Sequence, residues 1–204
     1  IVVTGGAGYS GSAATHHLAA AGHDVLVIDN LHQGHLAALP EAARFARVDI
    51  TDADSLREVV CGFQPDAAMH FAALTIAPES VQDPAPFWHV NLTGTLNLLD
   101  AMRAAGTSRL VFSSTAAVYG VPAQLPVSED AAKAPINPYG ATKLAVEHAI
   151  ATYAQAYGIS TAVLRYFNVA GASEEIGEDH TPETHLIPNV LFAAAGRAPA
   201  LTIY

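Results

Sequence analysis

Short apolar runs alternate with longer segments of helical periodicity along most of the chain, and this alternation restricts the fold more than any other feature. The apolar runs predict strands at 1–4, 25–29, 44–48, 67–71, 109–113 and 161–165, and the longer segments predict helices at 9–21, 52–63, 86–105 and 138–157. Repeats of strand, helix and strand form a parallel sheet with right-handed crossovers. The sequence therefore predicts an α/β domain with a doubly wound parallel sheet.

A glycine-rich loop follows the first predicted strand and opens the first predicted helix. Gly5, Gly8 and Gly11 stand at three-residue intervals in this loop. Such spacing lets the backbone turn tightly and approach a diphosphate, whose charge the helix N-terminus then stabilises. The triplet by itself is a weak signal, since an ordinary turn can carry the same glycines.

An acidic residue at the end of the second predicted strand gives the glycine loop a partner. Asp29 lies eighteen residues after Gly11, and Asn30 follows it. In Rossmann-like domains the acid that binds the adenosine ribose lies about 20 residues beyond the loop. Because an acid with no arginine beside it repels a 2′-phosphate, the sequence predicts NAD rather than NADP.

Tyr139 and Lys143 lie four residues apart, about one helical turn, just after the helix-start signal Asn137-Pro138. A phenol titrates near pH ~10, so a tyrosine base needs its pKa lowered by roughly 3 units. One positive charge at ~4 Å and an effective dielectric constant of ~20 supplies about that effect. Lys143 is therefore predicted to lower the pKa of Tyr139. Such pairs also arise by chance on solvated helix faces.

The composition excludes several classes of partner. Nine Lys and Arg against nineteen Asp and Glu give a net charge of −10, which argues against a nucleic-acid surface and against anionic lipid. No apolar run approaches the ~20 residues that span a bilayer, and no targeting segment opens the chain. A single cysteine, Cys61, makes a reducing cytoplasm the default location. Asp100 and Glu147 are expected to be solvated surface charges.

Ten histidines invite a metal interpretation. Neither His16 with His17 nor His32 with His35 has a matching set of cysteines or carboxylates, so we predict solvated or packing histidines and no metal. The acidic stretch around Glu178 and Asp179 is expected to be solvated.

The chain resembles the extended short-chain dehydrogenase/reductases and, within them, the UDP-hexose 4-epimerases. The resemblance runs nearly end to end, through TGGAGYSGS, VIDN, VDITD, HFAA, ESVQDP, NLTGTLNLLDAM, FSSTAAVYG, NPYGATK, LRYFNVAGA and GEDHTPETHLIP. It implies an NAD-dependent enzyme that inverts C4 of a UDP-hexose through a transient 4-keto sugar. It also implies a cytoplasmic homodimer that pairs the helices at 86–105 and 138–157.

The resemblance assigns roles to individual residues. It makes Tyr139 the catalytic base and acid, Lys143 its partner at the nicotinamide ribose, and Thr115 the hydroxyl that bonds the sugar 4-OH. Around NAD it places Gly5, Gly8, Tyr9, Ser10 and Gly11 at the diphosphate, Asp29, Asn30, Asp49 and Ile50 at the adenosine, and Phe71, Ala72, Ala73, Asn91 and Phe167 along the remainder. It places Asn168, His185 and Leu186 at the UDP part of the substrate.

Three departures accompany the resemblance, since Ser10, Thr75 and His185 replace the isoleucine, lysine and asparagine usual in the family. Dehydratases and decarboxylases of the family carry an acid soon after the Ser/Thr, whereas this chain has Ala116 and Ala117, which favours an epimerase. Two alternatives remain open: an epimerase of another nucleotide sugar, such as a UDP-N-acetylhexosamine or UDP-glucuronate, and a non-catalytic NAD-binding sensor.

The domain prediction divides the chain at residue 168. Residues 1–168 are expected to form the NAD-binding Rossmann-like domain, and 169–204 the start of a smaller substrate-binding lobe with a helix at 188–195. Both ends are expected to be cut. The residues that select the size of the sugar are expected beyond position 204.

Overall fold

The computed structural model describes residues 1–173, 176–180, 183 and 185–197. The chain divides into two compact units, Ile1–Phe167 and Asn168–Tyr204. The first contains the whole sheet, and the second contains one described helix.

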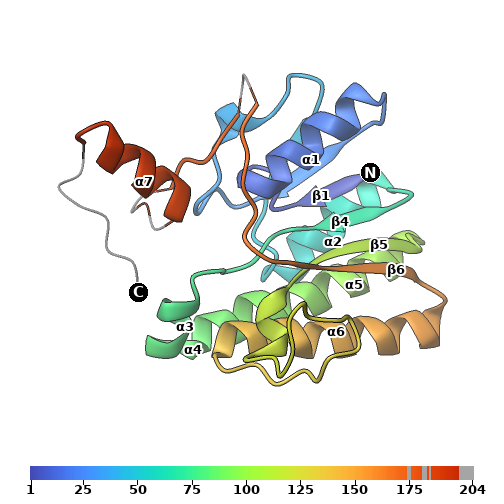
Figure 1. Cartoon of the computed structure of the whole chain (residues 1–204). Coiled ribbons are helices and arrows are strands. Elements are labelled where there is room, and N and C mark those ends of the chain that lie inside the picture. The colour runs from blue at the N-terminus through green and yellow to red at the C-terminus, as the bar shows by residue number, and fades with distance from the viewer. Residues whose placement is uncertain (174–175, 181–182, 184, 198–204) are drawn as a thin grey trace. The chain divides into compact units, whose positions relative to one another are not determined.

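A six-stranded parallel sheet forms the centre of the first unit, in the order β3-β2-β1-β4-β5-β6 (Figure 1). Its strands are β1 (Val2–Thr4), β2 (Leu26–Asp29), β3 (Arg44–Arg47), β4 (Ala68–His70), β5 (Arg109–Thr115) and β6 (Ser160–Tyr166). The doubly wound α/β prediction is confirmed. The order reverses between β1 and β4, and ligands of such sheets bind beyond the strand carboxyl ends at this reversal.

Helices connect the strands. They are α1 (Tyr9–Ala20), α2 (Ala53–Phe63), α3 (Ala77–Gln82), α4 (Pro84–Phe87), α5 (Gly94–Ala105) and α6 (Pro138–Tyr157), with short 3₁₀ turns at Leu36–Ala38 and Ala116–Tyr119. The helix predicted at 86–105 begins earlier and contains a π-helical turn, Trp88–Thr93. The sequence analysis missed α3 because six residues that begin with Ala-Pro carry little periodicity.

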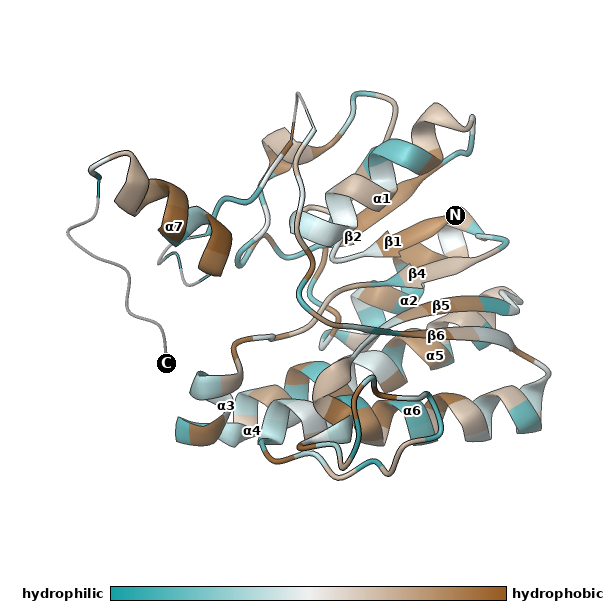
Figure 2. Ribbon diagram, in the orientation of Figure 1, coloured by the Kyte–Doolittle hydropathy of each residue, from teal (hydrophilic) through white to brown (hydrophobic). Residues whose placement is uncertain are grey.

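Alternate residues of each central strand face opposite layers, as the two-residue period of a strand requires. Val2, Leu26 and Ile28 belong to the larger core, together with apolar residues of α2, α5 and α6. Val3, Val25 and Val27 form a smaller core on the other face, where Leu18 of α1 is among the residues packed against them. The strands accordingly contain many of the hydrophobic residues in Figure 2.

The second unit contains helix α7 (Leu186–Ala194), which begins two residues before the predicted 188–195 segment. Several of its large apolar side chains are exposed, among them Leu186, Ile187 and Leu191. Across the described part of both units, no helix is long and apolar enough to cross a membrane.

Candidate functional site

The glycine loop lies at the carboxyl edge of β1, where close packing explains two of the three glycines of the Gly5, Gly8 and Gly11 triplet. Gly5 has φ +70°, and a Cβ there would lie 2.4 Å from the backbone nitrogen of Ala72. A Cβ on Gly11 would lie 2.1 Å from the carbonyl oxygen of Gly5. At Gly8 the nearest atom would be 3.4 Å away, an ordinary contact. Packing within the fold therefore requires glycine at positions 5 and 11, whereas it does not require glycine at position 8.

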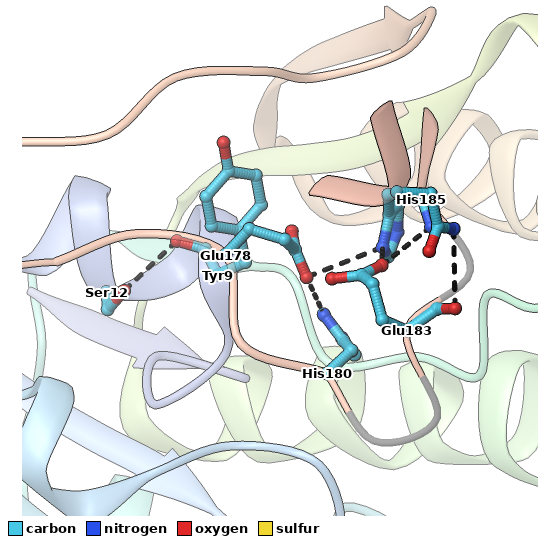
Figure 3. Close-up of polar contacts among 7 residues, drawn as sticks. Tyr9, Ser12, Glu178, His180, Glu183 and His185 are labelled. Carbon is cyan, nitrogen blue, oxygen red and sulfur yellow. Dashed lines mark hydrogen bonds and ion pairs between the residues drawn. The ribbon is translucent and has the colours of Figure 1, made fainter. Parts of the chain in front are cut away.

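Helix α1 begins directly at this loop. Its N-cap residue is Gly8, and no side chain in the described part of the chain caps this end by a hydrogen bond. Inside the first turn, the Ser12 hydroxyl donates to the carbonyl oxygen of Tyr9 at 3.0 Å (Figure 3). The first turn contains no acidic residue. A helix start of this kind directs its positive end at an anion.

Asp29 holds the glycine loop from the end of β2. The register places Ile28 beside Thr4, so the residues that follow both strands share one edge of the sheet. The Asp29 carboxylate accepts hydrogen bonds from the backbone N–H of Ala7 at 3.0 Å and of Leu31 at 2.8 Å. The predicted ribose acid therefore also positions the loop.

Asn30 and Asp49 meet at the ends of β2 and β3, where the resemblance places the adenosine. The Asn30 amide donates to the Asp49 carboxylate at 2.8 Å. Burial tends to raise the pKa of Asp49, but hydrogen bonds from Thr51 and Asn30 outweigh it and lower the pKa below its ordinary value. Asp49 is therefore a charged acceptor beside Asn30.

Asn91 ties the segment after β4 to helix α6. Its amide oxygen accepts from the backbone N–H of Leu74 at 2.8 Å, and its NH₂ group donates to Leu74 O at 3.0 Å and to Thr142 Oγ1 at 3.1 Å. Both N–H groups of the Asn91 amide have partners within the protein. Asn91 is therefore better suited to position the segment after β4 than to donate hydrogen bonds to a cofactor.

Two side chains hold the start of α6, which carries Tyr139. Asn137 is the N-cap, and its side-chain oxygen accepts from the backbone N–H of Gly140 at 2.8 Å, as the sequence predicts. Ser80 of α3 is buried, and its hydroxyl oxygen accepts from the backbone N–H of Tyr139 at 3.1 Å. The sequence analysis missed Ser80 because α3 itself went unrecognised.

Lys143 is almost fully buried, with 3% of its surface exposed. Its ammonium donates to the carbonyl oxygen of Ser113 at 2.9 Å and lies 4.9 Å from the centre of the Phe112 ring. Burial lowers the pKa of Lys143 from 10.5 to about 7. Both protonation states are thus accessible near neutral pH.

Burial has the largest effect on the pKa of Tyr139 and raises it, opposed by a hydrogen bond with Thr115. The pKa of Tyr139 is thus raised in the chain by itself, and the lowering effect expected of Lys143 stays a prediction. The phenol loses solvation, and burial also favours the neutral form of Lys143. The contact between Tyr139 and Thr115 nevertheless brings together two of the three predicted catalytic groups.

Replacing Lys143 by methionine is expected to change the pH dependence of stability. The pKa is about 7 in the folded chain and near 10.5 when unfolded. Between these two pH values the unfolded state binds more protons than the folded state. The free energy of unfolding of the unsubstituted protein is therefore lowest below about pH 7 and rises with pH until about pH 10.5. From about pH 7 to about pH 9, urea unfolding should show the parent gaining roughly 2–3 kcal/mol relative to Lys143→Met. Lys133→Met, at an exposed position, is the control. Equal slopes in parent and Lys143→Met would show that Lys143 stays protonated.

Glu147 is buried, with 9% of its surface exposed, so its prediction as a solvated charge is wrong. It accepts from the Ser114 hydroxyl at 2.6 Å and pairs with Arg165 of β6 at 2.7 Å. Arg165 also donates to the Tyr119 hydroxyl at 2.6 Å. This network joins α6 to the strand end that carries Thr115. The signal was present in the sequence, because Glu147 lies one turn after Lys143 on the same helix face.

His70 connects β1 and β4 beneath the glycine loop. Its Nδ1 lies 2.6 Å from Thr4 Oγ1, and its Nε2 lies 2.8 Å from Thr95 Oγ1. Because the Thr95 hydroxyl donates to Asn91 O, Nε2 carries the proton and Nδ1 accepts from Thr4. Burial, with a smaller effect of Lys143, lowers the pKa of His70 to about 3. His70 is thus a neutral structural histidine.

The remaining predicted residues fall into two groups. In the first unit, Ile50 is buried, Thr115 lies at the end of β5, and Phe167 is 71% exposed. Asn168, His185 and Leu186 belong to the second unit, where His185 is the N-cap residue of α7. Their proposed contacts with UDP stay predictions.

Comparison with known proteins identifies the family of the chain. The sequence profile of the NAD dependent epimerase/dehydratase family matches residues 1–204. UDP-glucose 4-epimerases of Streptomyces lividans and Lactobacillus helveticus are 50% and 48% identical, each over 100% of this chain and 62% of the relative. The chain thus spans about three fifths of these relatives.

Solved structures give the same result. UDP-glucose 4-epimerase from Brucella ovis in complex with NAD is 48% identical, with a TM-score of 0.96 over 100% of this chain and 63% of that one. UDP-glucose 4-epimerase from Stenotrophomonas maltophila, with bound NAD and formylated UDP-arabinopyranose, is 39% identical, with a TM-score of 0.91 over 97% and 62%. The UDP-Glc/GlcNAc 4-epimerase of Campylobacter jejuni is 34% identical, with a TM-score of 0.85 over 97% and 62%.

Proposed function

Because the chain belongs to the NAD dependent epimerase/dehydratase family, we propose that it binds NAD and inverts C4 of a UDP-hexose. The observation that carries this proposal is the arrangement of Tyr139 beside Thr115, with buried Lys143 one turn further along the same helix. Family membership by itself does not separate epimerases from dehydratases.

The first unit offers groups for each part of the dinucleotide. The glycine loop and the start of α1 suit the diphosphate, Asp29 and Asn30 the adenosine ribose, and Asp49 the adenine end. Lys143 is proposed to bond the nicotinamide ribose. NAD supplies a reversible hydride acceptor. Structures of two related UDP-glucose 4-epimerases contain bound NAD, which supports this choice of cofactor.

Tyr139 is proposed to take the proton from the sugar 4-OH and to return it after the 4-keto sugar has turned over in the site. Thr115 orients the hydroxyl and then the carbonyl. Since burial raises the pKa of Tyr139, the phenolate needs a positive charge nearby. A protonated Lys143, whose pKa lies near 7, is proposed to supply it when substrate is present.

An epimerase is favoured over a dehydratase by the segment after Thr115. This segment is the 3₁₀ turn Ala116–Tyr119, and it contains no carboxyl group. Removal of water from the sugar needs an acid that protonates the departing hydroxyl. Ala116 and Ala117 cannot protonate it.

The test uses the full-length protein. Incubation with UDP-galactose, and separately with UDP-N-acetylgalactosamine, should convert the former to UDP-glucose, measured by NMR of the anomeric proton. Conversion of the N-acetyl sugar alone would favour the alternative substrate, for which the Campylobacter jejuni relative is a precedent. Bound NAD with no conversion of either sugar would favour the sensor.

Asp29→Asn is expected to weaken NAD binding by at least about 10-fold, since the neutral amide loses charged bonds to the ribose hydroxyls. The Asp29 carboxylate also accepts a hydrogen bond from the backbone N–H of Ala7. A change in NAD affinity could therefore reflect the lost ribose contact or a shift of the glycine loop. The discriminating measurement is the NADP to NAD affinity ratio by calorimetry, which should rise because the repulsion of a 2′-phosphate is gone. Asp54→Asn, on the surface of α2, is the control. An unchanged ratio would contradict the ribose assignment.

A further inference from the structure

Two histidines and two glutamates gather in the second unit, in the segment before α7 (Figure 3). They are Glu178, His180, Glu183 and His185, here called the His/Glu cluster. Neither histidine pair weighed in the sequence analysis is part of it. The cluster has no role in the chemistry proposed for Tyr139, although His185 is among the residues predicted to contact UDP.

Three potential ligand atoms of the cluster lie close enough together to reach one metal ion. One ligand atom each from Glu178, His180 and His185 lie within 4.8 Å of one another. Glu178 Oε1 is 3.4 Å from His185 Nδ1 and is in close contact with His180 Nδ1. Around a tetrahedral zinc ion with bonds of about 2.0–2.1 Å, neighbouring ligand atoms lie roughly 3.3–3.4 Å apart. The separation between Glu178 Oε1 and His185 Nδ1 matches this spacing, whereas His180 Nδ1 and Glu178 Oε1 would have to move apart to bind the same ion.

The hydrogen bonds of the cluster also favour a metal ion. His185 Nδ1 faces two carboxylate oxygens, Glu183 Oε1 at 2.8 Å and Glu178 Oε1 at 3.4 Å. One ring nitrogen carries at most one hydrogen, so it cannot make a good bond to both. A cation between the ring nitrogen and the carboxylates would satisfy both oxygens at once.

We propose that Glu178, His180 and His185 bind a divalent transition-metal ion of the zinc class, with Glu183 as the neighbouring carboxylate. Mixed imidazole and carboxylate donors select zinc, cobalt or nickel over magnesium or calcium, which prefer oxygen ligands alone. The side chain of His185 is half exposed, at 49%, whereas that of Glu178 is 13% exposed. The cluster is thus accessible to solvent at His185.

The test is metal binding by the full-length protein, so it does not depend on epimerase activity. After treatment with a chelator, calorimetry with Zn²⁺ should show one ion per chain, and Co²⁺ should give the intense visible absorption of a tetrahedral complex. His180→Ala and Glu178→Gln should each weaken Zn²⁺ binding by at least about 100-fold, because each removes a ligand. The paired variant His32→Ala/His35→Ala is the matched control and should bind as the parent does.

Three results would overturn the proposal: no stoichiometric Zn²⁺ binding, binding that His180→Ala leaves unchanged, or equal loss in the His32→Ala/His35→Ala control. Circular dichroism identifies a variant that has failed to fold. The conservative Glu178→Gln variant, which keeps side-chain size, then provides the decisive comparison. A cluster that binds no metal in these experiments is a hydrogen-bond and ion-pair network.

Discussion

Tyr139→Phe is expected to lower kcat by roughly 10²–10⁴-fold, the range for loss of a general acid and base, while bound NAD is retained. The substitution removes only the hydroxyl. The backbone N–H of Tyr139 keeps its bond to Ser80, and Asn137 still caps α6. Burial of the ring is also unchanged, so the helix that carries Lys143 should stay in place. The loss would therefore report on proton transfer rather than on folding.

The measurements are turnover of UDP-galactose, NAD content after purification, and thermal unfolding. Tyr157→Phe is the matched control, because it removes the same atom from an exposed residue at the far end of α6. It should behave as the parent. Near-normal turnover by Tyr139→Phe would exclude this tyrosine as the base. Loss of NAD together with turnover would instead assign the hydroxyl to cofactor binding.

Gly11→Ala is expected to destabilise the protein by at least about 2 kcal/mol and to weaken NAD binding by about 100-fold or more. The new Cβ would lie 2.1 Å from Gly5 O, a backbone atom that a side-chain rotation cannot move. Helix α1 would have to shift away from the loop to remove this clash. Gly5 is itself closely packed, since a Cβ built on it would lie 2.4 Å from Ala72 N. The helix start would then point away from the place proposed for the diphosphate.

Gly62→Ala is the matched control for this substitution. Gly62 lies in α2, and a Cβ there would meet no atom within 4 Å. Alanine is favoured over glycine inside a helix by about 1 kcal/mol, so this variant should be at least as stable as the parent. Urea unfolding and calorimetry with NAD separate the two effects. Parent-like stability and affinity in Gly11→Ala would show that the helix and loop adjust without cost.

The parallel sheet and the start of α6 were predictable because their signals are local. Periodicity along the chain gave all six strands, and the Asn137-Pro138 pair marked where α6 begins. Helix α3 was not predicted because its six residues are too few to show a helical period. Ser80, which lies in α3, was therefore not predicted either, although its hydroxyl oxygen accepts a hydrogen bond from the backbone N–H of Tyr139.

The pKa shifts and the burial of charged side chains could not be predicted from neighbouring residues in the sequence. Lys143 was predicted to lower the pKa of Tyr139, yet burial raises that pKa and lowers the one of Lys143. Glu147 was predicted to be solvated, yet it lies against Ser114 and Arg165. Desolvation depends on everything packed around a group, and residues distant in sequence supply most of that packing.

The sequence by itself determined the six strands and the longer helices, and it placed the glycine loop, Asp29 and Tyr139 at segment ends. It did so because backbone geometry and hydrophobic periodicity act over a few neighbouring residues. Only the tertiary structure decided which side chains meet there and in which protonation state. Asn91 with Leu74, Glu147 with Arg165 and Glu178 with His185 become partners only when the fold or a loop brings them together.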